Sequence, residues 1–374
     1  MRNPYYLSII FVLIIVFVDK SLKDYGSSSY QSYIAIFSTV LSFFIIRNLK
    51  VLKGQDGMIK LVLTWLIWMI TTSFIVHPLG RITLIFGMLL QSILWVLIFL
   101  LFFIYSYKFP HWVYRNSKQF FFIVLFFSGF IFLTLPIDER NVYLSYYAIA
   151  SLPWIFLFNK AIWRYIGILF ISFISIFAEK RGGFLALIFA IPIFYSIESY
   201  VKRGAGLRIF YLILIFSFLV IVMMQLAQIT GSSIFERISL LKEDEGSGRI
   251  DIYEDLISSI KKFDLKTLSF GSGHNSTMEI VETFAHNEFL QILVDYGIVG
   301  LLLYIFLNII LIRKSIILIR NKSIYASSFC ASYIIFLTIS MVSHWFVMAQ
   351  FVIVLVSYWG LIFALTAKRR CSYS

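Results

Sequence analysis

Long apolar runs separated by short charged segments recur along the whole sequence, and this alternation constrains the fold more than any other feature. The runs are about 14 to 26 residues long, whereas a helix needs about 20 residues to cross a bilayer core of about 30 Å. Only 14% of the 374 residues are charged and 60% are hydrophobic, against roughly 25% charged residues in ordinary soluble domains. A water-soluble fold has too little interior for so much apolar surface. We therefore expect an all-α integral membrane protein.

The runs predict about 12 transmembrane helices. The expected spans are residues 4–18, 31–46, 59–76, 82–107, 119–135, 142–158, 162–177, 184–198, 209–227, 286–312, 324–342 and 347–367. Asp19 and Lys20 follow the first run without a small-x-small cleavage pattern, so we expect a retained span rather than a signal peptide. The chain divides into residues 1–227 with helices 1–9, a large hydrophilic loop at 228–285, and residues 286–374 with helices 10–12 and a basic tail.

Basic and acidic residues lie in opposite sets of loops. An even number of spans puts both termini on one side, and 20 of the 32 Lys and Arg residues fall in the loops of that side. Of the 19 Asp and Glu residues, 17 fall on the other side. The positive-inside rule makes the basic side cytoplasmic and the long loop extracytoplasmic. The net charge of +13 is thus mainly a topology signal, and we expect no nucleic-acid partner.

The long loop shows internal order. An amphipathic helix lying over the membrane domain is predicted at 249–262. Its apolar residues at helical spacing are Tyr253, Leu256, Ile257 and Ile260. The tripeptide Gly271-Ser272-Gly273 then predicts a turn.

A further helix is expected to begin at Ala285 and to lead into the tenth span. Residues spaced alternately by four and three would share one face of it: His286, Leu290, Leu293, Gly297, Gly300 and Tyr304. The glycines would let a neighbouring helix approach closely, and His286 would face the protein interior at the membrane surface. Asp295 falls near the opposite side, so we do not expect it to partner His286.

Three residues on the extracytoplasmic side could supply chemistry: Arg181, Arg249 and His286. Two guanidinium groups can bind a pyrophosphate through forked hydrogen bonds, and a neutral imidazole can accept a proton near pH 7. Gly182 and Gly183 would allow a ligand to approach the backbone after Arg181. Each residue also has an ordinary interpretation, as a snorkelling arginine, a solvated loop charge and a structural histidine.

Several familiar motifs are absent from the sequence. It contains no Walker sequence, no GxGxxG and no HExxH. Neither Cys330 nor Cys371 lies in the large loop, so no structural disulfide is expected there. We expect no metal and no nucleotide cofactor.

The pattern His286-Asn287, nine residues, Gly297, two residues and Gly300 resembles the signature of the O-antigen ligase and O-antigen polymerase family. In that family the signature follows the large periplasmic loop, which is its place here. The pair of glycines at 271 and 273 is also similar to the family pattern.

Two arginines resemble those of the same family. Arg181 lies in Arg-Gly-Gly at the expected end of the seventh span, and Arg249 lies in Gly-Arg-Ile-Asp-Ile-Tyr in the loop. Two positions depart from the family pattern, because Lys180 replaces a small hydroxyl residue and Tyr253 replaces a tryptophan.

The resemblance implies a C-type glycosyltransferase-like membrane enzyme with its active site on the periplasmic face of the bacterial inner membrane. It implies a donor glycan linked to undecaprenyl pyrophosphate, a glycan acceptor, contact with membrane lipid, and a chain-length regulator as a candidate partner. The catalytic residues would be His286, Arg249 and Arg181. The substrate-binding residues would be Lys180, Gly182, Gly183, Gly273, His274 and Asn287.

Two activities fit this resemblance. A polymerase joins lipid-linked repeat units into O-antigen or capsular polysaccharide, whereas a ligase transfers the polymer to lipid A–core. The compact loop favours the polymerase. A transporter or flippase of lipid-linked glycan is the alternative from another class, and it would place ionisable residues at mid-membrane. The expected spans carry almost no charge at their centres, which favours an enzyme.

Overall fold

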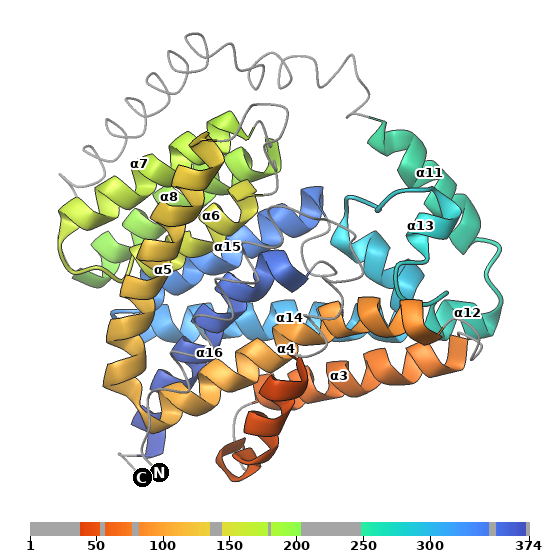
Figure 1. The fold of residues 1–374 in the computed structure, drawn as a ribbon, viewed down its shortest axis with the longest axis horizontal. Coiled ribbons are helices and arrows are strands. Elements are labelled where there is room, and N and C mark those ends of the chain that lie inside the picture. The colour runs from red at the N-terminus through yellow and green to blue at the C-terminus, as the bar shows by residue number, and fades with distance from the viewer. Residues whose placement is uncertain are drawn as a thin grey trace. The chain divides into compact units, whose positions relative to one another are not determined.

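The computed structural model describes residues 38–52, 57–76, 82–134, 144–178, 181–202, 248–343 and 349–371, and these residues form helices and turns without a strand (Figure 1). The predicted spans at 4–18 and 209–227 lie outside the described residues, as do Lys180 and the loop before Gly248. Of the predicted span 31–46, the described part from residue 38 is helical.

The other predicted spans coincide with long helices. These are α3 (Gly57–Val76), α4 (Ile82–Lys108), α5 (Pro110–Thr134), α6 (Leu144–Ile155), α7 (Ala161–Phe177), α8 (Arg181–Lys202), α14 (Glu288–Arg320), α15 (Ala326–Val342) and α16 (Ala349–Cys371). By length and composition, Gly182–Lys202 and Glu288–Arg320 suffice to cross a membrane, and several shorter stretches are also apolar. α5 begins well before the predicted residue 119, because Pro110 fits a first helical turn and the polar residues after it extend the helix beyond its apolar part.

Contacts divide the chain into two units. The first consists of residues 1–116, 249–310 and 340–374, and its core includes α4 packed against α16. A Cβ placed on Gly360 of α16 would lie 2.6 Å from the carbonyl oxygen of Phe99 in α4. The ring of Phe363 meets that of Phe99 edge-on, with centroids 6.0 Å apart. Because glycine has no side chain, Gly360 allows these two helices to approach this closely.

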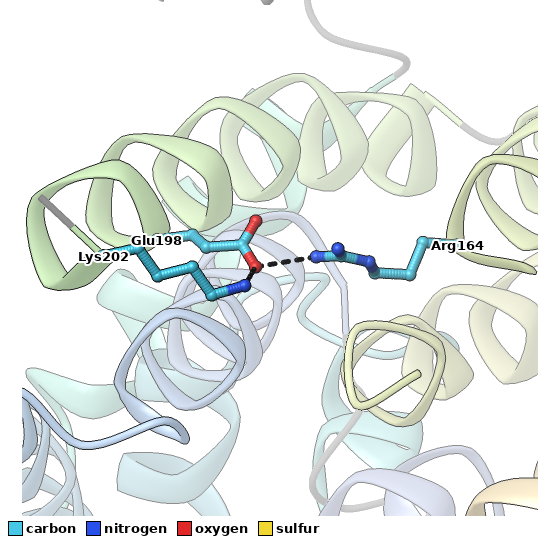
Figure 2. Close-up of polar contacts among 3 residues, drawn as sticks. All are labelled: Arg164, Glu198 and Lys202. Atoms are coloured by element: carbon cyan, nitrogen blue, oxygen red, sulfur yellow. Dashed lines mark hydrogen bonds and ion pairs between the residues drawn. The ribbon is translucent and has the colours of Figure 1, made fainter. Parts of the chain in front are cut away.

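The second unit consists of residues 117–248 and 311–339, and it contains α6, α7 and α8. Phe156 stacks on Phe194 of α8 with centroids 3.7 Å apart. Figure 2 shows how α7 and α8 are joined: Arg164 Nη1 lies 2.8 Å from Glu198 Oε1, and Lys202 Nζ bonds the same oxygen. Glu198 is one of two acidic residues that the charge pattern assigns to the basic side, and here two cations flank it.

The predicted amphipathic loop helix is present as α11 (Arg249–Ile260), followed by the short helices α12 (Leu265–Phe270) and α13 (Thr277–Ile280). Leu256 is fully buried and packs with Ala285 and Val294. Ile257, another apolar residue at helical spacing, is 43% exposed and lies outside this cluster. The buried stripe of α11 instead runs from Ile252 through Leu256 to Ile260, at spacings of four residues.

The α4–α16 contact predicts a cost for any side chain at Gly360. In Gly360→Ala the added methyl group would meet the backbone of α4, and we expect the free energy of unfolding to fall by about 1–3 kcal/mol. Gly57→Ala is the control, since a Cβ there has no neighbour within 4 Å. Thermal unfolding in detergent would compare the two variants, and equal melting temperatures would contradict the close contact.

Candidate functional site

α14 is not one continuous helix. Gly297 has φ 68° and ψ −171°, so the helix breaks there, and His286 has φ 51° and precedes the first helical residue, Glu288. The predicted single face from His286 to Tyr304 is therefore wrong, because a left-handed backbone interrupts the 3.6-residue repeat on which that face depends.

The segment between α12 and α13 packs directly on this break. A Cβ on Gly271 would lie 2.3 Å from the carbonyl oxygen of Asp295, and one on Gly297 would lie 2.3 Å from that of Ser269. Ser272 N–H donates to the carbonyl of Val294 at 2.8 Å. The two glycines thus allow backbone to touch backbone, and at Gly297 the nearest backbone is that of Ser269, in the last turn of helix α12.

Two further backbone carbonyls beside the break, those of Asp295 and Tyr296, accept hydrogen bonds from outside α14. Gly273 N–H donates to the carbonyl of Asp295 at 3.0 Å. Trp68 Nε1 of α3 donates to the carbonyl of Tyr296 at 3.2 Å and lies 3.5 Å from where a Cβ of Gly300 would be. At Gly300 the indole of Trp68 is in ordinary van der Waals contact, and the expected close approach of a neighbouring helix stays a prediction there. Buried carbonyls without partners would be costly, and these contacts remove that cost.

A buried polar network links the same segment to the start of α14. Asp295 accepts hydrogen bonds from Asn275 N–H at 3.1 Å, the Ser276 hydroxyl at 3.0 Å and Gln291 Nε2 at 2.9 Å. Asp295 and Gln291 are both fully buried. Sequence reasoning missed this network, although two polar residues four positions apart on an apolar helix were a visible signal.

His274 lies within this arrangement. Its side chain is only 7% exposed, and Nδ1 is 2.5 Å from the hydroxyl of Tyr296. The preceding Gly273 has φ 105°, a conformation that favours glycine. The contacts of His274 support the packing of the segment on α14, and its role in substrate binding stays a prediction.

The backbone around His286 is held from both sides. The N–H of Ala285 donates to Gln291 Oε1 at 2.9 Å, and the hydroxyl of Tyr253 donates to the carbonyl of His286 at 3.4 Å. Asn287 Oδ1 accepts from the N–H groups of residues 289 and 290 at 3.0 and 3.2 Å. Asn287 therefore caps the N-terminus of α14, a structural role beside the predicted contact with substrate.

Arg249 lies close to this group. It is the first residue of α11, one helical turn before Tyr253. Burial raises the pKa of the Tyr253 hydroxyl, and the positive charge of Arg249 acts in the opposite direction. Tyr253 thus lies beside both Arg249 and the backbone of His286, and the joint role of Arg249 and His286 in catalysis stays a prediction.

The third predicted residue, Arg181, belongs to the second unit. It is the first residue of α8, and its side chain lies outside the described residues. Gly183 follows in the first turn, where a Cβ would lie 2.7 Å from Ile149 Cδ1. Gly183 therefore allows α8 to pack on α6, and the roles of Lys180, Gly182 and Gly183 in binding substrate stay predictions.

A comparison with protein families confirms the resemblance found in the sequence. Residues 166–305 match the model of a family described as O-Antigen ligase. The match includes Arg181, Arg249 and His286, covers less than half of the chain, and supports the resemblance to the O-antigen ligase and polymerase family. This supports a glycosyltransferase-like function of the ligase or polymerase type. No curated protein matches the sequence.

The break in α14 generates a prediction for its glycine. Gly297→Ala would combine a strained φ with a backbone clash, so we expect poor folding and a large fall in melting temperature. Gly248→Ala is the control, because Gly248 also has a positive φ, 73°, but a Cβ there has no neighbour within 4 Å. It should lose only about 1 kcal/mol of stability. If both variants unfolded at the same temperature, the backbone approach would not be the constraint.

Proposed function

We propose that the chain is a polymerase that joins polyprenyl-pyrophosphate-linked oligosaccharide repeat units into O-antigen or capsular polysaccharide at the periplasmic face of the membrane. The observation that carries the proposal is that Tyr253, one helical turn after Arg249, donates to the backbone carbonyl of His286. In the proposal Arg249 supplies a cation and His286 accepts a proton, which glycosyl transfer from a pyrophosphate requires.

In the proposed reaction a hydroxyl oxygen of the acceptor sugar forms a bond to the anomeric carbon of the donor. His286 takes the hydroxyl proton, and the bond between the anomeric carbon and the pyrophosphate oxygen breaks. The polyprenyl pyrophosphate leaves with the bonding electrons. A single displacement inverts the anomeric centre and needs no metal in this scheme, because the guanidinium groups stabilise the departing charge.

Both proposed arginines are the first residues of helices, Arg181 in α8 and Arg249 in α11. The N-terminus of a helix carries partial positive charge and free backbone N–H groups. Arg249 therefore lies at a helix end that also favours an anion, and this position supports its assignment to the pyrophosphate of the donor. In the proposal Arg181 supplies the second cation.

A ligase is the second candidate, favoured by the printed description of the matching family. It would use the same donor and the same chemistry, with lipid A–core as the acceptor. The two reactions differ in the product that accumulates when the enzyme is inactive, so one experiment on the surface glycan separates them.

Removal of the proposed base should abolish most activity. We expect His286→Ala to lower the rate by about 10²- to 10⁴-fold. His286→Asn is the matched variant, because asparagine tolerates a positive φ but has no basic nitrogen. Gel analysis of the surface glycan in the native host provides the measurement. A single repeat left on the core would indicate a polymerase, and polymer left on the carrier lipid would indicate a ligase. An unchanged ladder would exclude His286 as the base.

Loss of the proposed pyrophosphate contact should depend on the guanidinium itself. We expect Arg249→Ala to lose most polymer and Arg249→Lys to recover only part of it, because an ammonium cannot make the forked contact. Lys262→Ala is the control, since Lys262 is an exposed cation just beyond the same helix. Full-length glycan in the control and short glycan in both Arg249 variants is the expected result. Equal loss in all three would mean that only total charge matters.

A further inference from the structure

Gln291 connects the backbone before His286 to the buried network of α14. Its side-chain oxygen accepts the N–H of Ala285 at 2.9 Å. Its nitrogen donates to Thr277 Oγ1 at 2.6 Å and to Asp295 Oδ2 at 2.9 Å. Gln291, Ala285, Thr277 and Asp295 are all fully buried. Because water cannot replace a lost partner there, each of these contacts is costly to break.

The neighbours determine which way the Gln291 amide points. Only its oxygen can accept the N–H of Ala285, and only its nitrogen can donate to the carboxylate of Asp295. Asp295 is itself held by Asn275 N–H and the Ser276 hydroxyl. The segment 275–277 therefore fixes the orientation of Gln291, and Gln291 in turn holds the backbone immediately before His286.

His286 needs this support because its φ of 51° is unfavourable for a residue with a side chain. On one side the carbonyl of His286 accepts from Tyr253 at 3.4 Å, a long contact. On the other side the bond from Ala285 to Gln291 is shorter, at 2.9 Å, and lies in a fully buried place. Gln291 thus restrains the backbone before His286 through a shorter and more deeply buried bond than the one from Tyr253.

We propose that Gln291 is a positioning residue, which holds Ala285 so that His286 keeps its left-handed backbone and stays aligned for proton transfer. The inference rests on the proposed function of His286 as the base. Gln291 does not touch the substrate in this scheme. Its loss should therefore affect the chemical step and leave the binding of the donor largely intact.

The test compares substitutions at two buried positions, each with a residue similar in volume to the one it replaces. Gln291→Met removes all three hydrogen bonds, and we expect kcat to fall by about 10- to 100-fold while KM changes by less than about threefold. Thr277→Val is the matched control, because it removes one bond to Gln291 and leaves the bond to Ala285. It should lower the melting temperature and keep kcat within about threefold of wild type.

The assay uses the full-length protein in lipid nanodiscs, with the carrier-linked repeat unit extracted from host cells that lack this chain. If Thr277→Val loses as much kcat as Gln291→Met, or if Gln291→Met raises KM instead of lowering kcat, Gln291 serves only general packing and the proposal is overturned.

A second pair of variants covers the case in which Gln291→Met does not fold. Gln291→Glu keeps the volume and an oxygen toward Ala285 but sets a second carboxylate against Asp295. The kcat of Gln291→Glu should fall. Adding Asp295→Asn should raise it again by about tenfold, because the amide nitrogen at position 295 can donate a hydrogen bond to the new carboxylate at position 291. No recovery would overturn the proposal.

His286→Asn, measured in the same assay, separates the two claims. If it retains wild-type kcat, the proposed function fails and the positioning role fails with it. If it is inactive while Gln291→Met retains wild-type kcat, only the positioning role fails.

Discussion

The break of α14 at Gly297 is the constraint on which the first unit depends. The backbone carbonyls of the three residues before it accept N–H donors from Ser272, Gly273 and the indole of Trp68. In a membrane protein a freed carbonyl must find a partner within the protein, so the break requires the 271–273 segment to lie against it. That segment in turn carries the groups that bind Asp295. The break at Gly297 and the buried polar network around Asp295 therefore depend on the same contacts with this segment.

Most of the described helices could be predicted from the sequence. A predicted span at 59–76 is found as Gly57–Val76, and one at 324–342 as Ala326–Val342, because runs of apolar residues end where charges begin. The loop helix α11 was also predicted, but the sequence did not show that Ile257 lies outside its buried stripe. On a short helix the apolar stripe can be drawn in two ways, and only the packing against Val294 selects between them.

The site was only partly predictable. The residues from His286 to Tyr304 are spaced by four and three positions in the sequence whether the helix is straight or broken. The sequence therefore could not reveal the positive φ of Gly297. Gln291 and Asp295 were visible as a polar pair, but their partners at 275–277 lie 14 to 20 residues earlier. No local periodicity relates residues at that distance, because their meeting depends on how the chain turns between α13 and α14, where Glu282 and His286 have positive φ.

The break also divides α14 mechanically. Its first turns are bonded to the 272–277 segment, whereas the part after Gly297 runs on to Arg320 as a helix that is apolar up to Arg313 apart from Asn308. A helix responds to a thicker or thinner bilayer by changing its tilt. The bonds from Ser272 and Gly273 hold the residues just before Gly297 to the loop, so a change of tilt would have to be taken up after the break. Sensitivity to hydrophobic mismatch would then be confined to the part of the helix beyond Gly297.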